Sequence, residues 1–211
     1  LSDGNAWMME GTTANRTVIV SSGDLDGRVF SISDNGQWLL FTRHSDDEDI
    51  INTLWVVNIN DPQIEIDLLV ENVIHFADWQ PGSTNLIAAS TVESRQAAPG
   101  WQANNDILIS NFSANGWVDP SPTVMVETNS GGVYGWWGMD FDYGLNAEML
   151  VYAGPDQIGT IDIEDGTRVS LLDIVPLKTL GDWAWVPGMR WGPAGNILFT
   201  VRHAPPEGAV S

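Results

Sequence analysis

The feature of this sequence that most constrains its fold is a short pattern that occurs four times. In each copy a bulky residue precedes a Gly-containing turn, and an apolar run follows the turn. The copies span residues 30–43, 76–90, 139–153 and 189–202. Their bulky residues lie 47, 62 and 50 positions apart and are Ile32, Trp79, Phe141 and Trp191. Self-similarity at a near-constant spacing indicates that the chain is built from repeated structural units.

Each repeat begins a unit with room for four β-strands. Long stretches with helical periodicity are missing, and short runs rich in Val, Ile, Leu, Trp, Phe and Thr are separated by Gly, Asn, Asp and Pro. Such runs occur at 16–22, 37–43, 53–59, 106–112, 122–128 and 148–154. Units of about 40–50 residues with four strands are typical of β-propellers. We therefore predict an all-β fold, a β-propeller of four-stranded antiparallel blades.

The two ends of the chain each supply two further strands. We predict one propeller domain over 1–211, with complete blades at about 28–70, 74–128 and 134–173 and a composite blade made of 1–22 and 186–203. Closure by both chain ends removes exposed sheet edges. This closure requires residues 197–201 to pair with residues 6–9, and residues 16–21 to form the outer strand beside 6–9. The alternatives are a slice of a larger propeller or one half of an assembled ring.

The repeat resembles that of the TolB-like (WD-type) β-propeller family, in which an aromatic residue and Ser-Pro-Asp-Gly precede a strand. The best matches are 30–43 with 54–59, and 191–202, while weaker copies begin at Trp79 and Phe141. The Asp-Gly turn is replaced in every copy, by DNG, QPG, DYG and GPAG. The resemblance implies a bacterial binding module in the periplasm, outside the cell or at its surface. The family typically has six blades, more than the repeats found here.

The charge balance limits the partners of this chain. It has 28 acidic and 8 basic residues among 211, for a net charge of −20. Nucleic-acid binders and proteins that adhere to anionic membranes need basic surfaces, so neither role is expected. No apolar stretch reaches about 18 residues, so we expect no transmembrane segment. The absence of Cys excludes disulfides and thiolate sites, and from the start at Leu1 we expect a trimmed or processed chain.

Long connections on one face of the predicted propeller carry the candidate binding residues. These b–c and d–a loops, which join the second to the third strand of a blade and one blade to the next, hold aromatic residues beside two Arg-His pairs. The candidates are Trp101, Trp136, Trp137, Trp183, Trp185, Arg43, His44, Arg202 and His203. Such a cluster suits a peptide, a glycan or another protein. The alternative is that the Trp side chains pack between strands and that the repeated Arg-His is a feature of blade packing.

Acidic loops give a second candidate site, for calcium. The proposed ligands are Asp24, Asp26, Asp46 and Asp47, with further acidic pairs such as Asp140 and Asp142. Calcium takes six to eight oxygen ligands from flexible loops, but none of these loops has EF-hand spacing. The alternative is a solvated acidic loop that aids solubility, so we predict no cofactor, with calcium as the exception.

No catalytic motif accompanies these features, since the nucleophile elbow, the zinc-binding HExxH motif and the P-loop are all missing from the sequence. We predict that the chain is not an enzyme but a binding or scaffold module for a protein or peptide at the long-loop face. One alternative is a propeller enzyme, a glycan lyase or hydrolase, that uses Arg43 and His44 at the channel mouth. Another is a structural subunit of a cell-surface assembly. The oligomeric state stays open.

Overall fold

The computed structural model describes a chain of β-strands. The described residues are 5–9, 11, 15–21, 29–44, 52–68, 73–92, 105–113, 116–117, 123–126, 139–154, 157–173 and 188–200. They form strands β1 to β17 and contain no helix. Within these ranges, therefore, no helix is long and apolar enough to span a bilayer. The all-β prediction is confirmed for this part of the chain.

Three antiparallel sheets follow one another along the chain, and in two of them the strand order is the chain order. The first sheet comprises β3 (Val29–Ile32), β4 (Trp38–His44), β5 (Asn52–Asn58) and β6 (Glu65–Asp67). The third comprises β12 (Asp140–Tyr143), β13 (Met149–Ala153), β14 (Gln157–Asp162) and β15 (Arg168–Asp173). Both are four-stranded meanders, as predicted for propeller blades.

The middle sheet has the same beginning and a divided outer edge. Its first three strands pair in chain order and are β7 (Val73–Trp79), β8 (Leu86–Val92) and β9 (Asn105–Ser113). Two short strands then share the outer edge of β9, namely β10 (Gly116–Trp117) and β11 (Thr123–Val126).

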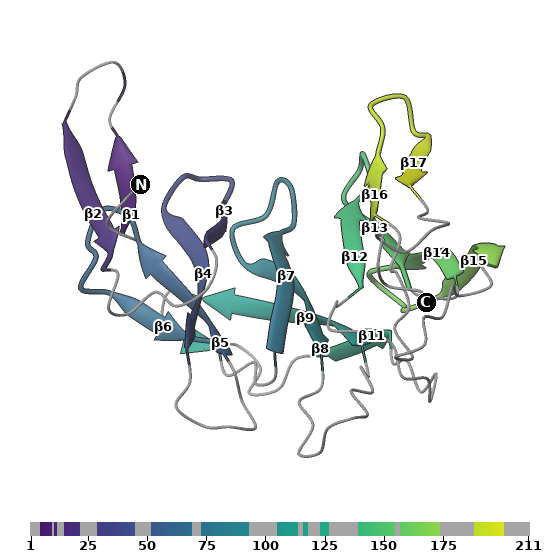
Figure 1. Ribbon diagram of the computed structural model, residues 1–211, viewed down its shortest axis with the longest axis horizontal. Helices are drawn as coiled ribbons and strands as arrows, with labels where there is room; N and C mark the ends of the chain where they lie inside the picture. Colours follow the sequence, from purple (N-terminus) through teal and green to yellow (C-terminus); the bar gives the residue numbers. More distant parts are fainter. Residues whose placement is uncertain are drawn as a thin grey trace, which may run out of the picture.

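Two hairpins stand at the ends of this row of sheets (Figure 1). At one end β1 (Ala6–Met9) pairs with β2 (Arg16–Val20), which confirms the predicted neighbour of 6–9. At the other end β16 (Gly188–Trp191) pairs with β17 (Ile197–Thr200). The predicted pairing of 197–201 with 6–9 is not present, because the hairpins form separate two-stranded sheets at opposite ends of an open arc. Three sheets do not turn the row far enough to bring the two ends together.

Face-to-face packing joins neighbouring elements of the row. Alternate side chains of β4 point to opposite faces, as in any strand. Leu39 and Phe41 pack against Ile19 and Val20 of the first hairpin. On the other face, Trp38 and Leu40 pack against the middle sheet through residues that include Trp79, Ile87 and Phe112. Because both faces of this part of β4 are covered, its first four residues are all apolar instead of alternating.

The turns between first and second strands show which positions are equivalent. Ser33, Gly144 and Gly192 each donate a backbone N–H across the hairpin, at 2.7–2.9 Å, and accept one from the residue three positions later. In these three turns that later residue, Gly36, Ala147 or Gly195, has positive φ. In the fourth turn Gln80 likewise donates its N–H across the hairpin and accepts one from Ser83, but the residue with positive φ is Gly82. This alignment makes Tyr143 the equivalent of Trp79 and Trp191. The predicted equivalent, Phe141, was wrong by two residues because both positions are aromatic.

Gly159 has no room for a side chain. A Cβ there would lie 2.7 Å from Tyr152 Oη, 2.8 Å from Tyr152 Cζ and 2.9 Å from the carbonyl oxygen of Val169. Tyr152 is buried and lies directly opposite Gly159 in the sheet. We expect Gly159→Ala to lower the free energy of unfolding by about 1–3 kcal/mol, the usual cost of overpacking. Urea unfolding measures it, and the loss should shrink in a Tyr152→Leu background; equal losses in both backgrounds would contradict this packing.

Candidate functional site

The first strand of each sheet and the C-terminal hairpin place one polar side chain at the same structural position. The turns are aligned on the residues that donate across each hairpin, which are Ser33, Gln80, Gly144 and Gly192. The polar side chains two positions earlier are Ser31, Asp78, Asp142 and Arg190. We call these four residues the inner row. β3 lies against β7 and β12 lies against β16, so the inner row contains two neighbouring pairs, Ser31 with Asp78 and Asp142 with Arg190.

Hydrogen bonds from the inner row and from the neighbouring Gln80 tie adjacent sheets together. Ser31 Oγ donates to Asp78 Oδ1 at 2.6 Å, which joins the first sheet to the middle one. The backbone N–H of Trp79 donates to the same oxygen at 2.9 Å. Between the middle and third sheets, Gln80 Nε2 donates to the carbonyl of Ala147 at 2.8 Å. Each sheet interface thus carries a polar link at its inner edge.

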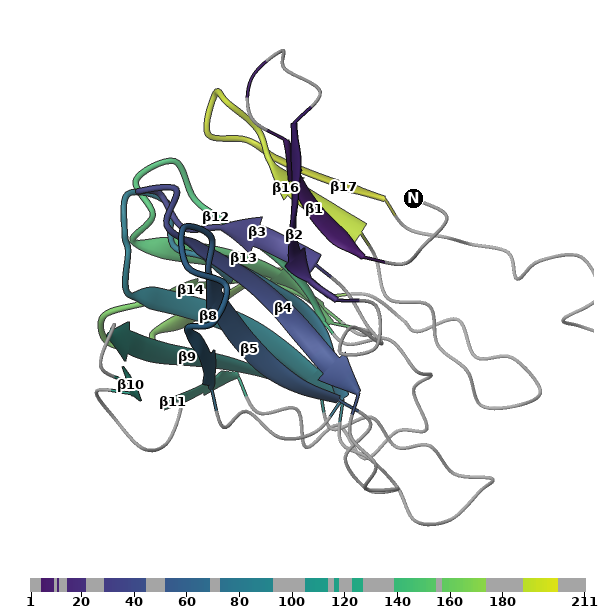
Figure 2. The ribbon, with the colours of Figure 1, turned by 90° about the vertical axis from the view of Figure 1, so that its left-hand side faces the viewer.

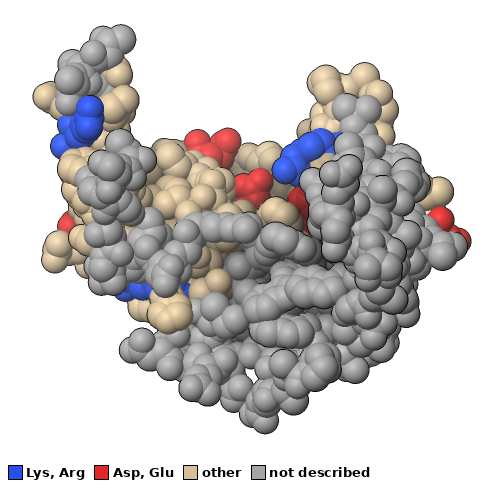
Figure 3. Space-filling view, in the orientation of Figure 1, with Lys and Arg blue, Asp and Glu red and all other residues tan. Residues whose placement is uncertain are grey.

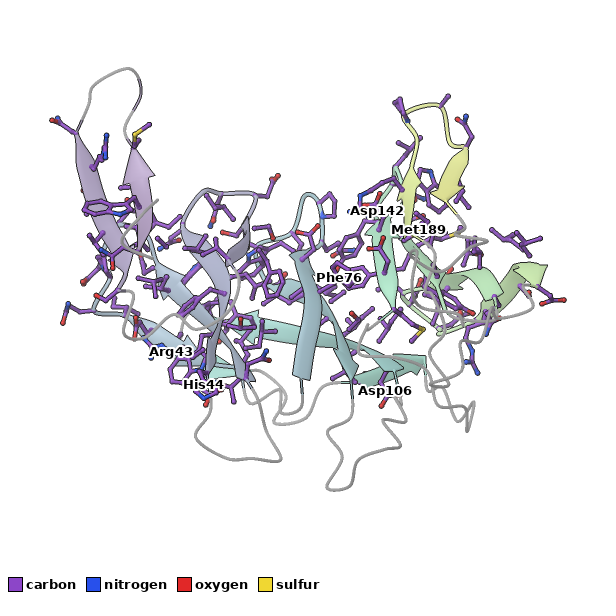
Figure 4. All side chains as sticks on the ribbon, in the orientation of Figure 1. Arg43, His44, Phe76, Asp106, Asp142 and Met189 are labelled. Carbon is purple, nitrogen blue, oxygen red and sulfur yellow. The ribbon has the colours of Figure 1, made fainter. Side chains whose placement is uncertain are left out.

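The carboxylates of β12 hold the C-terminal hairpin. Asp142 Oδ2 accepts the N–H of Trp191 at 2.8 Å, and Asp140 Oδ2 accepts the N–H of Met189 at 3.1 Å. Arg190 Nη1 lies 3.1 Å from Asp140 Oδ2 and completes the link with an ion pair. Figure 4 shows Asp142 and Met189 side by side where β12 meets β16.

Burial and neighbouring charges set the protonation of this cluster. Burial raises the pKa of Asp78 above its ordinary value of 3.8, and the negative charge of Asp142 raises it further. The hydrogen bonds from Ser31 and Trp79 and the charge of Arg190 oppose that rise. Burial also raises the pKa of Tyr143, to which the charge of Asp78 adds. Among the described residues, Asp78, Asp140 and Asp142 therefore gather near one cation, that of Arg190.

Acidic side chains are visible in the hollow between the two raised hairpins (Figure 3), with a basic side chain on one wall. Among the described residues, no group of three His, Cys, Asp or Glu side chains is arranged to hold a metal ion. The predicted calcium ligands Asp24, Asp26, Asp46 and Asp47 lie outside the described residues. The arrangement suits recognition of cationic groups of a ligand.

Two of the predicted binding residues are described, and they lie away from the inner row. Arg43 Nη2 bonds Glu65 Oε2 at 2.7 Å, and its guanidinium lies 4.5 Å from the ring centroid of Trp55. Its charge and its planar face are therefore both engaged within the first sheet. His44 ends β4 opposite Asn52, and Figure 4 places both residues far from Asp142. The other predicted binding residues lie outside the described part of the chain: Trp101, Trp136, Trp137, Trp183, Trp185, Arg202 and His203.

Asp78 was not predicted from the sequence, although a signal was present. It is an acidic residue in a strand whose other residues are apolar except for His75, and it stands directly before the bulky residue of its repeat. Comparison of the four repeats in the register of their turns, rather than by aromatic residues, would have aligned it with Asp142.

No family model matches this chain, and no curated protein matches it. Solved structures do resemble it. A structure from Agrobacterium tumefaciens assigned as TolB aligns with a TM-score of 0.56 and 15% identity, over 95% of this chain and 66% of that one. A prolyl endopeptidase structure also aligns with a TM-score of 0.56, at 11% identity, over 88% of this chain and 27% of that one. The chain thus spans 27% of the endopeptidase chain and 66% of the TolB-type chain. These likenesses support a β-propeller fold.

The link between Asp140 and the C-terminal hairpin should depend on the carboxylate more than on the ion pair. The Asp140 side chain is 11% exposed and that of Arg190 is 65% exposed. Asp140→Ala leaves the Met189 N–H without its acceptor, and we expect a loss of about 1–3 kcal/mol in the free energy of unfolding. Arg190→Ala removes an exposed partner and should cost about 0–1 kcal/mol. Chemical denaturation of both variants checks the order, and a larger loss for Arg190→Ala would contradict it.

Asp78 should make the protein less stable as the pH rises. Because its pKa is higher in the folded state than the ordinary 3.8, the folded state binds more protons between these two values. Its contribution to stability therefore falls as pH rises through that window and stays unfavourable above it. Asp78→Asn keeps an acceptor for Ser31 without the charge, so the stability of the variant relative to the native chain should increase with pH. Urea unfolding of both proteins from pH 3.5 to 7 measures the difference; a decrease with pH would refute the assignment.

Proposed function

We propose that this chain is a non-catalytic propeller module that binds a basic segment of a protein or peptide in the hollow beside its inner strands. The observation that carries the proposal is the accumulation of Asp78, Asp140 and Asp142 around the guanidinium of Arg190, the one cation of the cluster in the described part of the chain. Three carboxylates against one cation leave the cluster with excess negative charge, which a cationic side chain of a partner would offset.

The chemistry of the cluster supports a ligand with several donors. An ionised carboxylate has about four acceptor positions, and the hydrogen bonds already made by Asp78 and Asp142 occupy only part of that capacity. Both side chains are half-buried, so they remain accessible while solvent screening is reduced. Lys and Arg side chains carry three and five N–H donors, respectively.

The charge of the whole chain supports the same class of partner. A net charge of −20 attracts basic partners over a distance of about 10 Å at moderate salt, and it repels acidic ones. Complementary charge chiefly raises the association rate and the specificity. We therefore expect the binding to weaken as salt is added.

The proposal also assigns the chain to the TolB-like repeat family. It includes a protein partner and a periplasmic or extracellular setting in a bacterium. The repeat pattern and the likeness to the Agrobacterium tumefaciens structure support it. The long-loop face, with its Trp residues, would be a second contact surface for the same partner.

Binding of a fluorescent lysine-rich peptide tests the proposal. We expect Asp142→Asn and Asp78→Asn each to raise the Kd by about tenfold, equivalent to about 1.4 kcal/mol. The amide oxygen keeps the acceptor for Trp191 or Ser31, so both folds should persist. Fluorescence anisotropy at two salt concentrations gives the Kd and its salt dependence.

Glu164→Gln is the matched control for charge. Glu164 is exposed in the turn between β14 and β15, and its substitution by Gln removes the same unit of charge as Asp142→Asn. We expect it to change the Kd less than twofold. Equal effects from Glu164→Gln and Asp142→Asn would show only nonspecific attraction by the acidic chain and would refute the site.

A further inference from the structure

The inner edge between the middle and third sheets places two carboxylates next to each other. Figure 2 looks along the row and shows β3 and β12 at the same edge of the stacked sheets. Between the first two sheets, Ser31 donates to Asp78. Between the middle and third sheets, Gln80 Nε2 bonds the carbonyl of Ala147 at 2.8 Å, which holds the ends of β7 and β12 together. The inner-row residues of these two strands are Asp78 and Asp142, which repel each other when both are ionised.

Arg190 does not neutralise this pair of carboxylates, because its guanidinium is engaged elsewhere. Its Nη1 lies 3.2 Å and 3.1 Å from the two carboxylate oxygens of Asp140 and donates to the carbonyl of Met189 at 2.7 Å. In the described part of the chain, no hydrogen bond or ion pair joins Arg190 to Asp78 or Asp142. The pair therefore has negative charge to offer to a cation from outside.

Tyr143 supplies a second, independent sign of a ligand at this edge. Its side chain is 6% exposed and packs against Ala88, the residue directly opposite Asp78 in the pairing of β7 with β8. The phenol thus lies beside Asp78, and its Oη forms no hydrogen bond with any described residue. The backbone of Ala88 approaches it, but a phenol has one donor and two acceptor positions. An unpaired hydroxyl in a buried place is unfavourable, so a partner from outside would stabilise it.

The open acceptor positions of this edge belong to three separate groups. Asp78 Oδ1 accepts from Ser31 and from the N–H of Trp79, whereas Oδ2 accepts from no described residue. Asp142 Oδ2 accepts from Trp191, and its Oδ1 accepts from no described residue. Both carboxylates are half-buried, so they are accessible to a ligand. Each group offers one oxygen, and no carboxylate offers two.

We propose that this edge binds one primary ammonium group through Asp78 Oδ2, Asp142 Oδ1 and Tyr143 Oη, and that it therefore selects lysine over arginine in the bound segment. We call these three acceptors the ammonium site. An ammonium carries three donors that point in different directions, which suits three separate acceptors. A guanidinium presents a planar fork that suits both oxygens of one carboxylate. The choice of a lysine side chain as the source rests on the proposed function, and a free amine has the same chemistry.

Two fluorescent peptides of equal length and charge test the selectivity, one with lysine and the other with arginine at every basic position. We expect the lysine peptide to bind the native chain about fivefold more tightly, the size of one hydrogen bond. Tyr143→Phe should reduce this preference to less than about twofold. Ser110→Ala is the control, because it also removes a buried hydroxyl without a partner, outside the inner row. Equal Kd values for both peptides, each raised by Asp142→Asn, would keep the acidic binding site and overturn the ammonium site.

The stability of Tyr143→Phe without peptide separates a ligand role from a structural one. The variant removes a hydroxyl that has no partner in the free protein, so the urea midpoint should stay the same or rise. A lower midpoint would show that the hydroxyl is bonded within the free fold, and it would overturn the proposal.

NMR of chains labelled with 13C at tyrosine Cζ tests the site apart from the peptide. The chain has three tyrosines, and the resonance lost in Tyr143→Phe is that of Tyr143. We expect n-butylammonium, which reproduces the lysine side chain, to move this resonance more than n-butylguanidinium at equal concentration. Movement with n-butylammonium, without binding of either peptide, would support the ammonium site and refute the basic segment as its source. A resonance that moves with neither n-butylammonium nor the lysine peptide would overturn the site.

Discussion

The fold depends on each sheet having both of its faces covered by its neighbours in the row. Hydrophobic burial contributes about 25 cal/mol per Å², and a sheet that is apolar on both faces gains it fully only between two partners. The first sheet shows this directly, with Leu39 and Phe41 buried on one side and Trp38 and Leu40 on the other. Toward the ends of the row, Met9 of β1 and Val169 of β15 are exposed.

The inner edge of each interface meets a different requirement. There the sheets open toward solvent in the hollow, so hydrogen bonds supplement apolar packing. Ser31 with Asp78, Gln80 with Ala147, and Asp142 with Trp191 are three solutions at successive interfaces. Two of these links use carboxylates as acceptors, Asp78 and Asp142, so the groups that join the elements also concentrate negative charge. The structural role and the proposed binding role of the inner row therefore have one physical origin.

Much of the fold could be predicted from the repeat, because hydrophobic runs and turn residues act locally. The four-stranded sheets and the pairing of 6–9 with 16–20 followed from such signals. The curvature of the row could not be predicted, since it depends on packing between sheets, and the expected pairing of 197–201 with 6–9 failed for that reason. The site was harder still. Arg43 resembled a binding residue in the sequence, but its partner Glu65 comes from another strand. Asp78 gained its significance only when the register placed it near Asp142.

The central claim is that a basic segment occupies the acidic site around Asp78 and Asp142. An NMR titration of the Asp78 carboxyl carbon tests it most directly. The free protein should show a pKa above the ordinary 3.8. Saturation with a lysine-rich peptide should lower that pKa, because nearby cations favour the charged carboxylate. An Asp78 pKa that stays the same in the saturated complex would contradict the account.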